Sequence, residues 1–470
     1  MPVRMEFRTP GPGVRSGLPW LLLGLSLAWL AGAAEPPRSV PAPATATQAA
    51  DWPVFLGPSG DGKSAERGLF LRWPAAGPRV VWHKRLGASY GICSVRGGRL
   101  YQFDRFGDQA RLTCMDALSG DEFWRFEYPT DYTDMYGYNG GPRCSPLVDG
   151  DRVYLYGAEG LMHCLRASDG QLLWRVDMHA KFGVVQNFFG VGSNPVVDGP
   201  RLVVMVGGSP PESRGVPQGS LDQVVGNGSG VVALDKLTGQ VLYSITDELA
   251  SYASLKLATI HGRRWCFAFA RGGLVGFNPT TGRVDFQYPW RAKLLESVNA
   301  STPVVVDDQV FISETYGPGS SLLKVRPGGY EIVWQDELRS RDKALQTHWN
   351  TPIYHEGYLY GCSGRHTHQA DIRCIEWKTG RVKWTAERTA RTSLLYADGH
   401  FISLSEFGQL IVFKANPEQF EPVATVDEGA LRAETGEPLL TYPCWAAPIL
   451  AHGLLYLRGN DRLVCLDLRG

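Results

Sequence analysis

The chain has 470 residues, with 47 basic and 47 acidic side chains and a pI of about 7.1. Because no basic excess is available to neutralise phosphates, this balance argues against a nucleic-acid partner. Glycine (55), tryptophan (14) and tyrosine (19) are abundant, which suits many short strands joined by tight turns.

The N-terminus, residues 1–34, has the features of a secretory signal peptide. Three arginines precede an apolar run, Leu18–Leu30, and small residues follow it. An uncleaved membrane anchor is the alternative, although the run is shorter than the roughly 20 residues that span a bilayer. Residues 35–50 are rich in Pro, Ala and Thr and are expected to form a tether. We therefore expect an exported protein, periplasmic or on the outer face of the inner membrane, that meets a membrane only through an uncleaved N-terminal segment.

Residues 51–79 are expected to form an extended segment that packs outside the ring formed by the rest of the chain. Within it, Gly57–Ser64 (GPSGDGKS) matches the phosphate-binding pattern G-x-x-x-x-G-K-[ST]. That pattern needs a helix directly after it. Ala65–Pro74 shows little helical periodicity, so we interpret the match as a glycine-rich loop.

From residue 80 onward one hairpin recurs. In Val231–Tyr243 (VVALDKLTGQVLY), two alternating runs flank a tight turn at Thr238–Gly239, as in an antiparallel β-hairpin. The other copies are Leu112–Trp124, Met162–Trp174, Leu274–Phe286, Leu322–Trp334, Ile372–Trp384 and a degenerate Leu410–Val426. A further pair of strands precedes each hairpin, as in Ser145–Tyr156. Four short strands per unit, repeated about every 40–50 residues, are typical of β-propeller blades.

The ends of the repeat region set the number of blades at eight. The chain finishes with three strands only, within Ala447–Asp467, and the repeat region begins with a single strand, Val80–Arg85. We expect this strand to complete the last blade and close the ring, which removes exposed sheet edges. The sequence thus predicts an all-β, eight-bladed propeller of four-stranded antiparallel blades over residues 80–470.

The long connections follow the fourth strand of a blade or join its second and third strands, so they gather on one face of the ring. Long loops on a rigid scaffold are common binding sites, and aromatic side chains mixed with arginine are common anchors. The candidate residues in these loops are Tyr136, Tyr138, Asn139, Arg143, Phe188, Phe189, Trp290, Arg291, His348 and Trp349. We expect a monomer that binds a protein partner or a small ligand on this face; a cover of the channel that packs on itself is the alternative.

Signals for chemistry are sparse. His366 and His368 can share one side of an extended loop and are weak metal-ligand candidates, but no third ligand is evident and an exposed polar loop explains them equally. No catalytic triad or carboxylate pair stands out, so no catalytic residue is assigned. Four of the nine cysteines fill one repeat position that wants a small residue.

The hairpin resembles that of the PQQ-like (quinoprotein-type) repeat β-propeller family. Ala233, Asp235, Thr238 and Gly239 match the family's Ala-x-Asp and Thr-Gly pattern, and Trp384 matches its tryptophan. The family includes PQQ-dependent dehydrogenases and the outer-membrane-protein assembly lipoprotein, which binds no quinone. The chain looks most like secreted bacterial members of unassigned activity.

The resemblance implies two functions. One is a non-catalytic binding or scaffold module that uses the long-loop face. The other is a PQQ-dependent alcohol or sugar dehydrogenase with a divergent site, for which PQQ with Ca²⁺ would be the cofactor. The dehydrogenases typically carry adjacent cysteines against the cofactor, and this chain has no Cys-Cys pair.

Overall fold

The computed structural model describes residues 50–185, 188–217, 220–295 and 297–469. They belong to one compact unit, Pro43–Gly470. The expected signal peptide, and all of the expected tether except Ala50, lie outside the described residues. Within the described part of the chain, no helix has the length and apolar character needed to cross a membrane.

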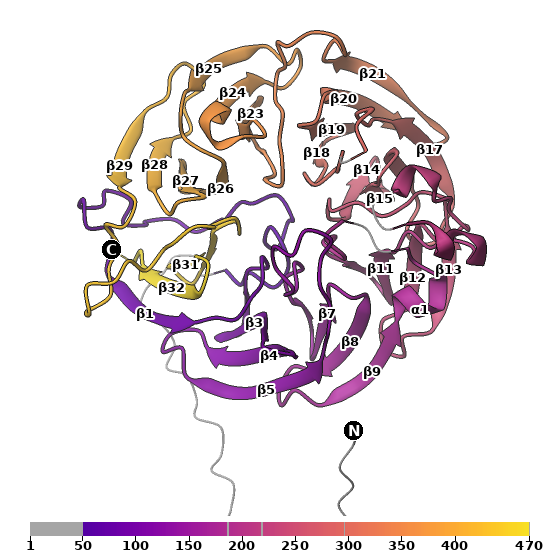
Figure 1. The fold of residues 1–470 in the computed structure, drawn as a ribbon. Helices are drawn as coiled ribbons and strands as arrows, with labels where there is room; N and C mark the ends of the chain where they lie inside the picture. Colours follow the sequence, from indigo (N-terminus) through magenta and orange to yellow (C-terminus); the bar gives the residue numbers. More distant parts are fainter. Residues whose placement is uncertain (1–49, 186–187, 218–219, 296, 470) are drawn as a thin grey trace, which may run out of the picture. The chain divides into compact units, whose positions relative to one another are not determined.

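Eight four-stranded antiparallel sheets surround a central axis and confirm the predicted eight-bladed propeller (Figure 1). The innermost strands are β2 (Ser94–Arg96), β6 (Leu147–Asp149), β10 (Val196–Asp198), β14 (Lys256–Ile260), β18 (Val304–Val306), β22 (Ile353–His355), β26 (Thr392–Ala397) and β30 (Ile449–Ala451). The second strands are β3 (Arg99–Phe106), β7 (Arg152–Tyr156), β11 (Arg201–Met205), β15 (Arg263–Phe269), β19 (Gln309–Glu314), β23 (Tyr358–Ser363), β27 (His400–Ser405) and β31 (Leu454–Arg458).

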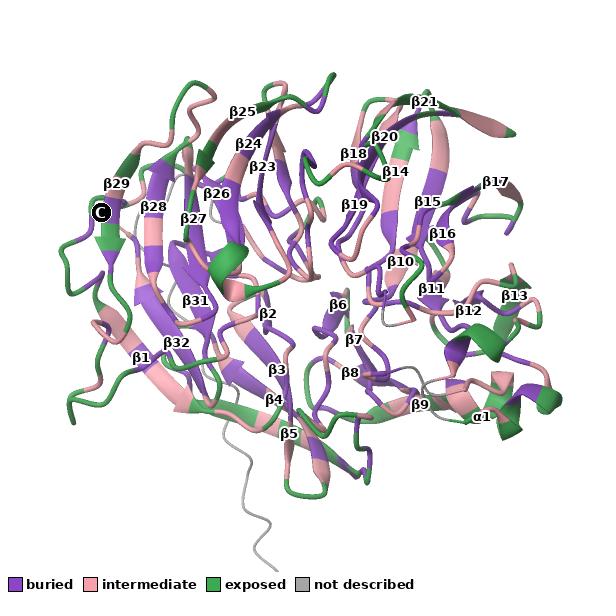
Figure 2. Ribbon diagram, turned by 45° about the horizontal axis from the view of Figure 1, so that its top comes forward, coloured by how far each residue is buried: buried purple, intermediate pink, exposed green. Residues whose placement is uncertain are grey.

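The outer half of each blade is the recurring hairpin. The third strands are β4 (Gln109–Asp116), β8 (Leu161–Arg166), β12 (Val231–Asp235), β16 (Gly273–Phe277), β20 (Gly319–Arg326), β24 (Asp371–Glu376), β28 (Leu410–Lys414) and β32 (Arg462–Asp467). The outermost strands are β5 (Glu122–Pro129), β9 (Leu172–Asp177), β13 (Val241–Ile245), β17 (Val284–Pro289), β21 (Gly329–Gln335), β25 (Val382–Ala386), β29 (Pro422–Val426) and β1 (Val80–Arg85). Figure 2 shows that burial falls toward the rim, since β12 is almost wholly buried and β13 is partly exposed.

Among the described residues, the short helical turns lie in the connections between strands. They are α1 (Met178–Phe182), η1 (Pro211–Gly215), η2 (Leu221–Gln223) and η3 (Thr367–Gln369). The turns between first and second strands and between third and fourth strands are short. The long connections are 130–146, 178–195, 206–230, 290–303, 336–352 and 427–448. Because strands alternate in direction, these connections all leave the sheets on one face of the ring, as the sequence predicts.

The repeated tryptophan and turn glycine dock one blade onto the next. The Nε1 of Trp174 in β9 donates to the carbonyl of Lys236, 3.1 Å away in the next blade. Gly239 in that blade has a φ of 74°, and a Cβ there would meet the Trp174 ring at 2.8 Å. Trp334 and Trp384 donate to the following blade in the same way. The hairpin motif is therefore a joint between blades, and no ligand is needed to explain it.

The strand β1 closes the ring by pairing with β32 in the last blade. Trp82 of β1 lies opposite Cys465, just as Trp124 lies opposite Cys114 in the first blade. The Nε1 of Trp82 donates to the carbonyl of Ala117 at 3.2 Å. The closing seam therefore repeats the joint found between the other blades.

All nine cysteines are buried free thiols. The four at the repeat position lie on third strands, and burial raises the pKa of the Cys114 thiol to about 11 and that of Cys374 to about 12. These cysteines therefore stay protonated near neutral pH and fill space between blades.

The segment 51–79, which the sequence analysis placed outside the ring, adds no strand to a blade. Its first part, from Trp52 to Lys63, crosses the axis (Figure 1), whereas Leu69 pairs with Arg469 after the last strand. Trp52 pairs with Val95 of β2, and the carbonyls of Ser59 and Gly60 accept hydrogen bonds of 2.9 and 2.6 Å from Lys256 Nζ of β14. Lys63 then pairs with Tyr396 of β26, and no helix follows the glycine-rich stretch. Exposed backbone groups on the inner strands on different sides of the ring thereby gain partners.

Candidate ligand pocket and binding face

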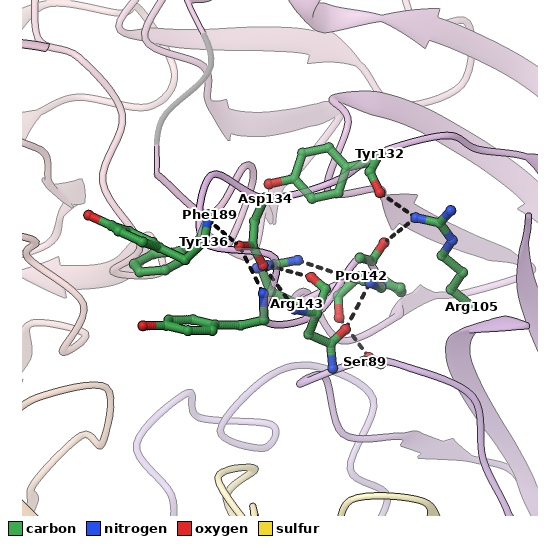
Figure 3. Close-up of polar contacts among 12 residues, drawn as sticks. Ser89, Arg105, Tyr132, Asp134, Tyr136, Pro142, Arg143 and Phe189 are labelled. Atoms are coloured by element: carbon green, nitrogen blue, oxygen red, sulfur yellow. Dashed lines mark hydrogen bonds and ion pairs between the residues drawn. The ribbon is translucent and has the colours of Figure 1, made fainter. Parts of the chain in front are cut away.

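The first long loop, between β5 and β6, is wound around the carboxylate of Asp134 (Figure 3). Its oxygens accept hydrogen bonds from the backbone N–H groups of Tyr136 (2.9 Å), Tyr138 (3.1 Å) and Asn139 (2.9 Å). The Nη2 of Arg143 lies 3.0 Å from Asp134 Oδ2, and the two side chains are only 7% and 0% exposed. These bonds give the loop a defined shape that carries Tyr136 and Tyr138 at its tip.

The same loop is anchored to the first blade (Figure 3). Arg105 of β3 donates to the carbonyls of Tyr132 and Gly140, the latter at 3.1 Å. The hydroxyl of Ser89 donates to the carbonyl of Pro142 at 2.7 Å. The loop is therefore continuous with the rigid sheet beneath it.

Aromatic side chains from two long loops, 130–146 and 178–195, and from the shorter connection 246–255 form a cluster over the axis. The rings of Tyr136 and Tyr138 stack at 5.5 Å, Tyr138 stacks on Phe189 at 6.3 Å, and Phe189 lies 5.5 Å from Tyr252. Phe188 lies 6.2 Å from Tyr136. Tyr138 is 67% exposed and Tyr136 is 44% exposed, so the outer part of this aromatic cluster is available to a partner.

A second aromatic wall is built on a buried ion pair. The rings of Trp349 and Trp445 lie 4.9 Å apart, and the guanidinium of Arg391 lies over them at 4.6 and 5.4 Å. Both oxygens of Glu406 accept from Arg391 Nε at 3.0 Å. Burial raises the pKa of Glu406, but hydrogen bonds from Arg391 and Thr367 outweigh it and hold that pKa below its usual value. The arginine is thus fixed beneath the tryptophans as part of the wall.

His348 continues this wall as a neutral side chain. Its Nε2 lies 3.2 Å from the hydroxyl of Tyr316. Burial lowers the pKa of His348 to about 3, with further lowering by the charges of Arg391 and Arg365. The guanidinium of Arg365 lies 4.3 Å from the centre of the Tyr316 ring. The charges of both arginines therefore disfavour protonation of His348, and Glu406 opposes them in part.

Between the two walls is a pocket of about 520 Å³, a size that accommodates a small organic ligand. Its sides are the residues that precede the innermost strands, such as Ile92, Ser145 and Ser254. Phe55 and Leu56 of the crossing segment also line it. The pocket therefore lies on the axis at the long-loop face, and the N-terminal segment supplies part of its lining.

The structure brings most of the candidate residues to this pocket. Those that line it are Tyr136, Tyr138, Arg143, Phe188, Phe189, His348, Trp349 and the weak metal candidate His366. Asn139 does not line it and instead holds the loop, because its Oδ1 accepts from the Gly141 N–H at 2.8 Å.

Three other candidates, Trp290, Arg291 and His368, do not line the pocket. Trp290 is 4% exposed and donates to the Gly319 carbonyl at 3.1 Å. Arg291 pairs with Asp222 at 2.6 Å. The rings of His366 and His368 stack at 5.9 Å, and the described residues contain no group of three His, Cys, Asp or Glu side chains that could hold a metal ion.

Several lining residues gave no signal in the sequence. Arg365, Arg391 and Trp445 come from separate blades, and no local motif marks them. The only available signal is position, since each precedes an innermost strand or lies between a second and a third strand. Glu314 is a further residue that sequence reasoning missed: it is 1% exposed and accepts from the Ser297 hydroxyl at 2.9 Å.

The buried carboxyl of Glu314 is expected to make the free energy of unfolding depend on pH. Burial raises its pKa from 4.5 to about 7, so its contribution to stability is full below pH 4.5 and is lost as the pH rises through 7. Between pH 5 and 7 this carboxyl should lower the free energy of unfolding by up to about 1.4 kcal/mol per pH unit. Glu314→Gln should remove that slope and exceed the wild type in stability at pH 8. Urea titrations at pH 5, 6, 7 and 8 measure this, with exposed Glu337→Gln as the control; parallel slopes for Glu314→Gln and wild type would refute it.

The pocket suits the ring system of the implied PQQ but does not supply ligands for the implied Ca²⁺. Flat aromatic walls and arginines suit a planar anionic ring system. Among the described residues that line the pocket there is no carboxylate for a calcium ion, although calcium requires six to eight oxygen ligands. The buried carboxylates of Asp134 and Glu406 are engaged by Arg143 and Arg391. The residues present therefore do not fit a calcium-quinone centre.

Comparisons with known proteins agree with this architecture. The model of the PQQ_2 family, described as outer membrane protein assembly factor BamB, matches residues 108–386. The outer membrane protein assembly factor BamB of Shewanella oneidensis is 30% identical over 108 residues, which are 21% of this chain and 27% of that protein. The matched part thus spans only about a quarter of this relative.

Solved structures share the fold at low sequence identity. BamB from Moraxella catarrhalis superposes with a TM-score of 0.54 at 13% identity, covering 83% of this chain and 97% of that one. Quinohemoprotein alcohol dehydrogenase from Comamonas testosteroni gives a TM-score of 0.58 at 11% identity, covering 89% and 81%. Since the family model spans more than half of the sequence, this chain belongs to the PQQ_2 family of BamB-like propellers.

Proposed function

We propose that this protein is an exported, non-catalytic binding module that engages a protein partner through its long-loop face. The single observation that carries the proposal is the exposed Tyr136–Tyr138 pair, stacked at 5.5 Å on a loop fixed by Asp134. Exposed tyrosines on a preorganised loop are typical interface anchors, because little side-chain freedom is lost on binding. The signal-peptide pattern of residues 1–34 supports export to the periplasm or the outer face of the inner membrane.

Family membership supports a protein as the partner. The matching relatives are named as factors in outer membrane protein assembly, and such a factor acts on other proteins. By the same reasoning, the partner of this chain is an exported protein that it holds or presents. The domain order that goes with this proposal is a signal peptide or anchor at 1–34, a tether at 35–50, an extended N-terminal segment at 51–79 and a monomeric propeller at 80–470.

The test is a crosslinking pull-down from envelope extracts of cells that make the full chain. We expect a partner, identified by mass, whose affinity falls about 30-fold or more when Tyr136→Ser and Tyr138→Ser are combined. Leu237→Ser is the matched control, because Leu237 is 53% exposed at a short turn on the opposite face. Capture that survives the double tyrosine change and is lost with Leu237→Ser would refute the proposed face.

A quinoprotein oxidoreductase is the second candidate, because the aromatic walls and arginines of the axial pocket suit a planar anionic ring, although the pocket lining lacks carboxylates for calcium. Reconstitution with PQQ and Ca²⁺ separates the two functions. Saturable quinone binding together with dye reduction by alcohols or sugars would establish this candidate. Under the binding-module proposal, neither is expected.

A further inference from the structure

The axial pocket contains three arginines, and two of them are already neutralised. Arg143 is paired with the buried Asp134 at 3.0 Å, and Arg391 is paired with the buried Glu406. Arg365 differs from both: within the described part of the chain, no carboxylate lies within the 4.0 Å of an ion pair, and its guanidinium rests on the Tyr316 ring. The pocket therefore holds one positive charge that a bound anion can balance.

The neighbouring side chains report the same imbalance. His348, between Tyr316 and Trp349, is kept neutral by burial and by the positive charges of Arg391 and Arg365. Among the described carboxylates, Glu406 opposes them at His348 and is already engaged by Arg391. The carboxyl of Glu314 also interacts with Arg365, but burial raises its pKa to about 7. An anion placed beside Arg365 would thus enter a region of positive potential.

Two polar atoms on this wall lack a partner. Among the described residues, Trp349 Nε1 and His348 Nδ1 are buried with no hydrogen-bond partner. An indole N–H is a donor only, and leaving it unpaired carries a free-energy cost. Both atoms are buried within the wall, so a ligand with acceptor oxygens reaches them only if the Trp349 or His348 side chain shifts.

The remaining surfaces of the pocket are flat and aromatic. Trp445 lies 4.9 Å from both Trp349 and Tyr90, and the facing wall carries Phe188 and Tyr252. Ring systems favour offset stacking or edge contacts with such side chains. The volume of about 520 Å³ leaves room for a fused-ring ligand.

We propose that the axial pocket binds a small aromatic carboxylate without a metal ion, with the carboxylate on Arg365 and the ring against Trp349 and Trp445. This site goes beyond the proposed function, because it adds a small-molecule ligand to a module that holds a protein. It also differs from a calcium-quinone centre, because its charge balance is complete with one monoanion.

The experiment uses the full chain and 2-naphthoate as the probe, with tryptophan fluorescence and calorimetry as readouts. We expect saturable binding that is unchanged by EDTA, at least tenfold tighter than that of the neutral isostere 2-naphthamide. Arg365→Gln should weaken naphthoate at least tenfold and leave naphthamide unchanged. Arg326→Gln is the control, since Arg326 is an exposed arginine (65%) on another surface.

The comparison of the two probes on the wild-type chain needs no variant, so a folding defect in Arg365→Gln does not remove the test. Equal affinity for naphthoate and naphthamide, no saturable binding, or binding that requires Ca²⁺ would each overturn the inference. The outcome is separable from the proposed function. Loss of naphthoate binding with partner capture intact refutes only the ligand site, and failed capture with selective naphthoate binding refutes only the partner.

Discussion

Asp104→Ala is expected to lower the free energy of unfolding by about 3–5 kcal/mol. Asp104 is on β3 of the first blade and pairs with Arg458 on β31 of the last blade at 2.6 Å, with side-chain exposures of 4% and 2%. The pair therefore lies across the seam that closes the ring. Arg458 also donates to the carbonyl of Gly87 at 2.8 Å.

Asp104→Ala lowers stability because it leaves the charge of Arg458 buried without a partner. Burial raises the pKa of Asp104, and the charge and hydrogen bond of Arg458 oppose that rise. Removing the carboxylate leaves Arg458 charged and buried without its partner, which is more costly than losing both charges together. Urea denaturation should therefore show a smaller loss for the double change Asp104→Leu with Arg458→Met than for Asp104→Ala alone.

An exposed ion pair within the last blade is the control that tests whether burial is the reason. Asp461 pairs with Arg85 at 3.4 Å, with exposures of 42% and 74%, and Asp461→Ala should cost at most about 1 kcal/mol. Equal losses for Asp104→Ala and Asp461→Ala would contradict the assignment of the buried pair as a determinant of ring closure.

Asp134→Ala is expected to dismantle the first long loop and to lower the free energy of unfolding by about 3 kcal/mol or more. The change removes the acceptor for three backbone N–H groups and the partner of buried Arg143. Tyr136 and Tyr138 then lose their fixed position. We expect partner capture to fall as far as in the double tyrosine variant, although both tyrosines are still present.

Limited proteolysis and denaturation measure the two parts of this result. Cleavage within residues 130–143 should accelerate in Asp134→Ala and remain at the wild-type rate in Asp131→Ala, which changes an exposed carboxylate of the same loop. An Asp134→Ala chain that resists protease and retains the partner would show that the loop does not depend on this carboxylate.

The ring could be predicted from sequence because its joints are local and repeated. Trp174 and Gly239 belong to hairpins whose spacing is visible along the chain, and the unpaired strand around Trp82 predicted how the ring closes. The direction in which the long loops leave the blades also follows from strand order. The binding face could therefore be predicted without knowing where any side chain lies.

The pocket itself could be predicted only in part. Tyr138 and Trp349 were recognised as aromatic loop residues, but Arg365 and Trp445 converge on the axis from blades that are distant in sequence. Phe55 lines the pocket because the N-terminal segment crosses the ring, and no repeat pattern predicts that path. Trp290 carries the same sequence signal as Trp349, yet it packs on Tyr288 at 5.6 Å instead of facing the axis.

The most direct test of the binding face is site-specific photocrosslinking of the full chain in the cells that make it. A benzophenone amino acid is placed at Tyr138, on the long-loop face, or at Leu237, on the opposite face. We predict a discrete adduct of defined mass from position 138 and none from position 237. An adduct from position 237 with none from position 138 would contradict the account.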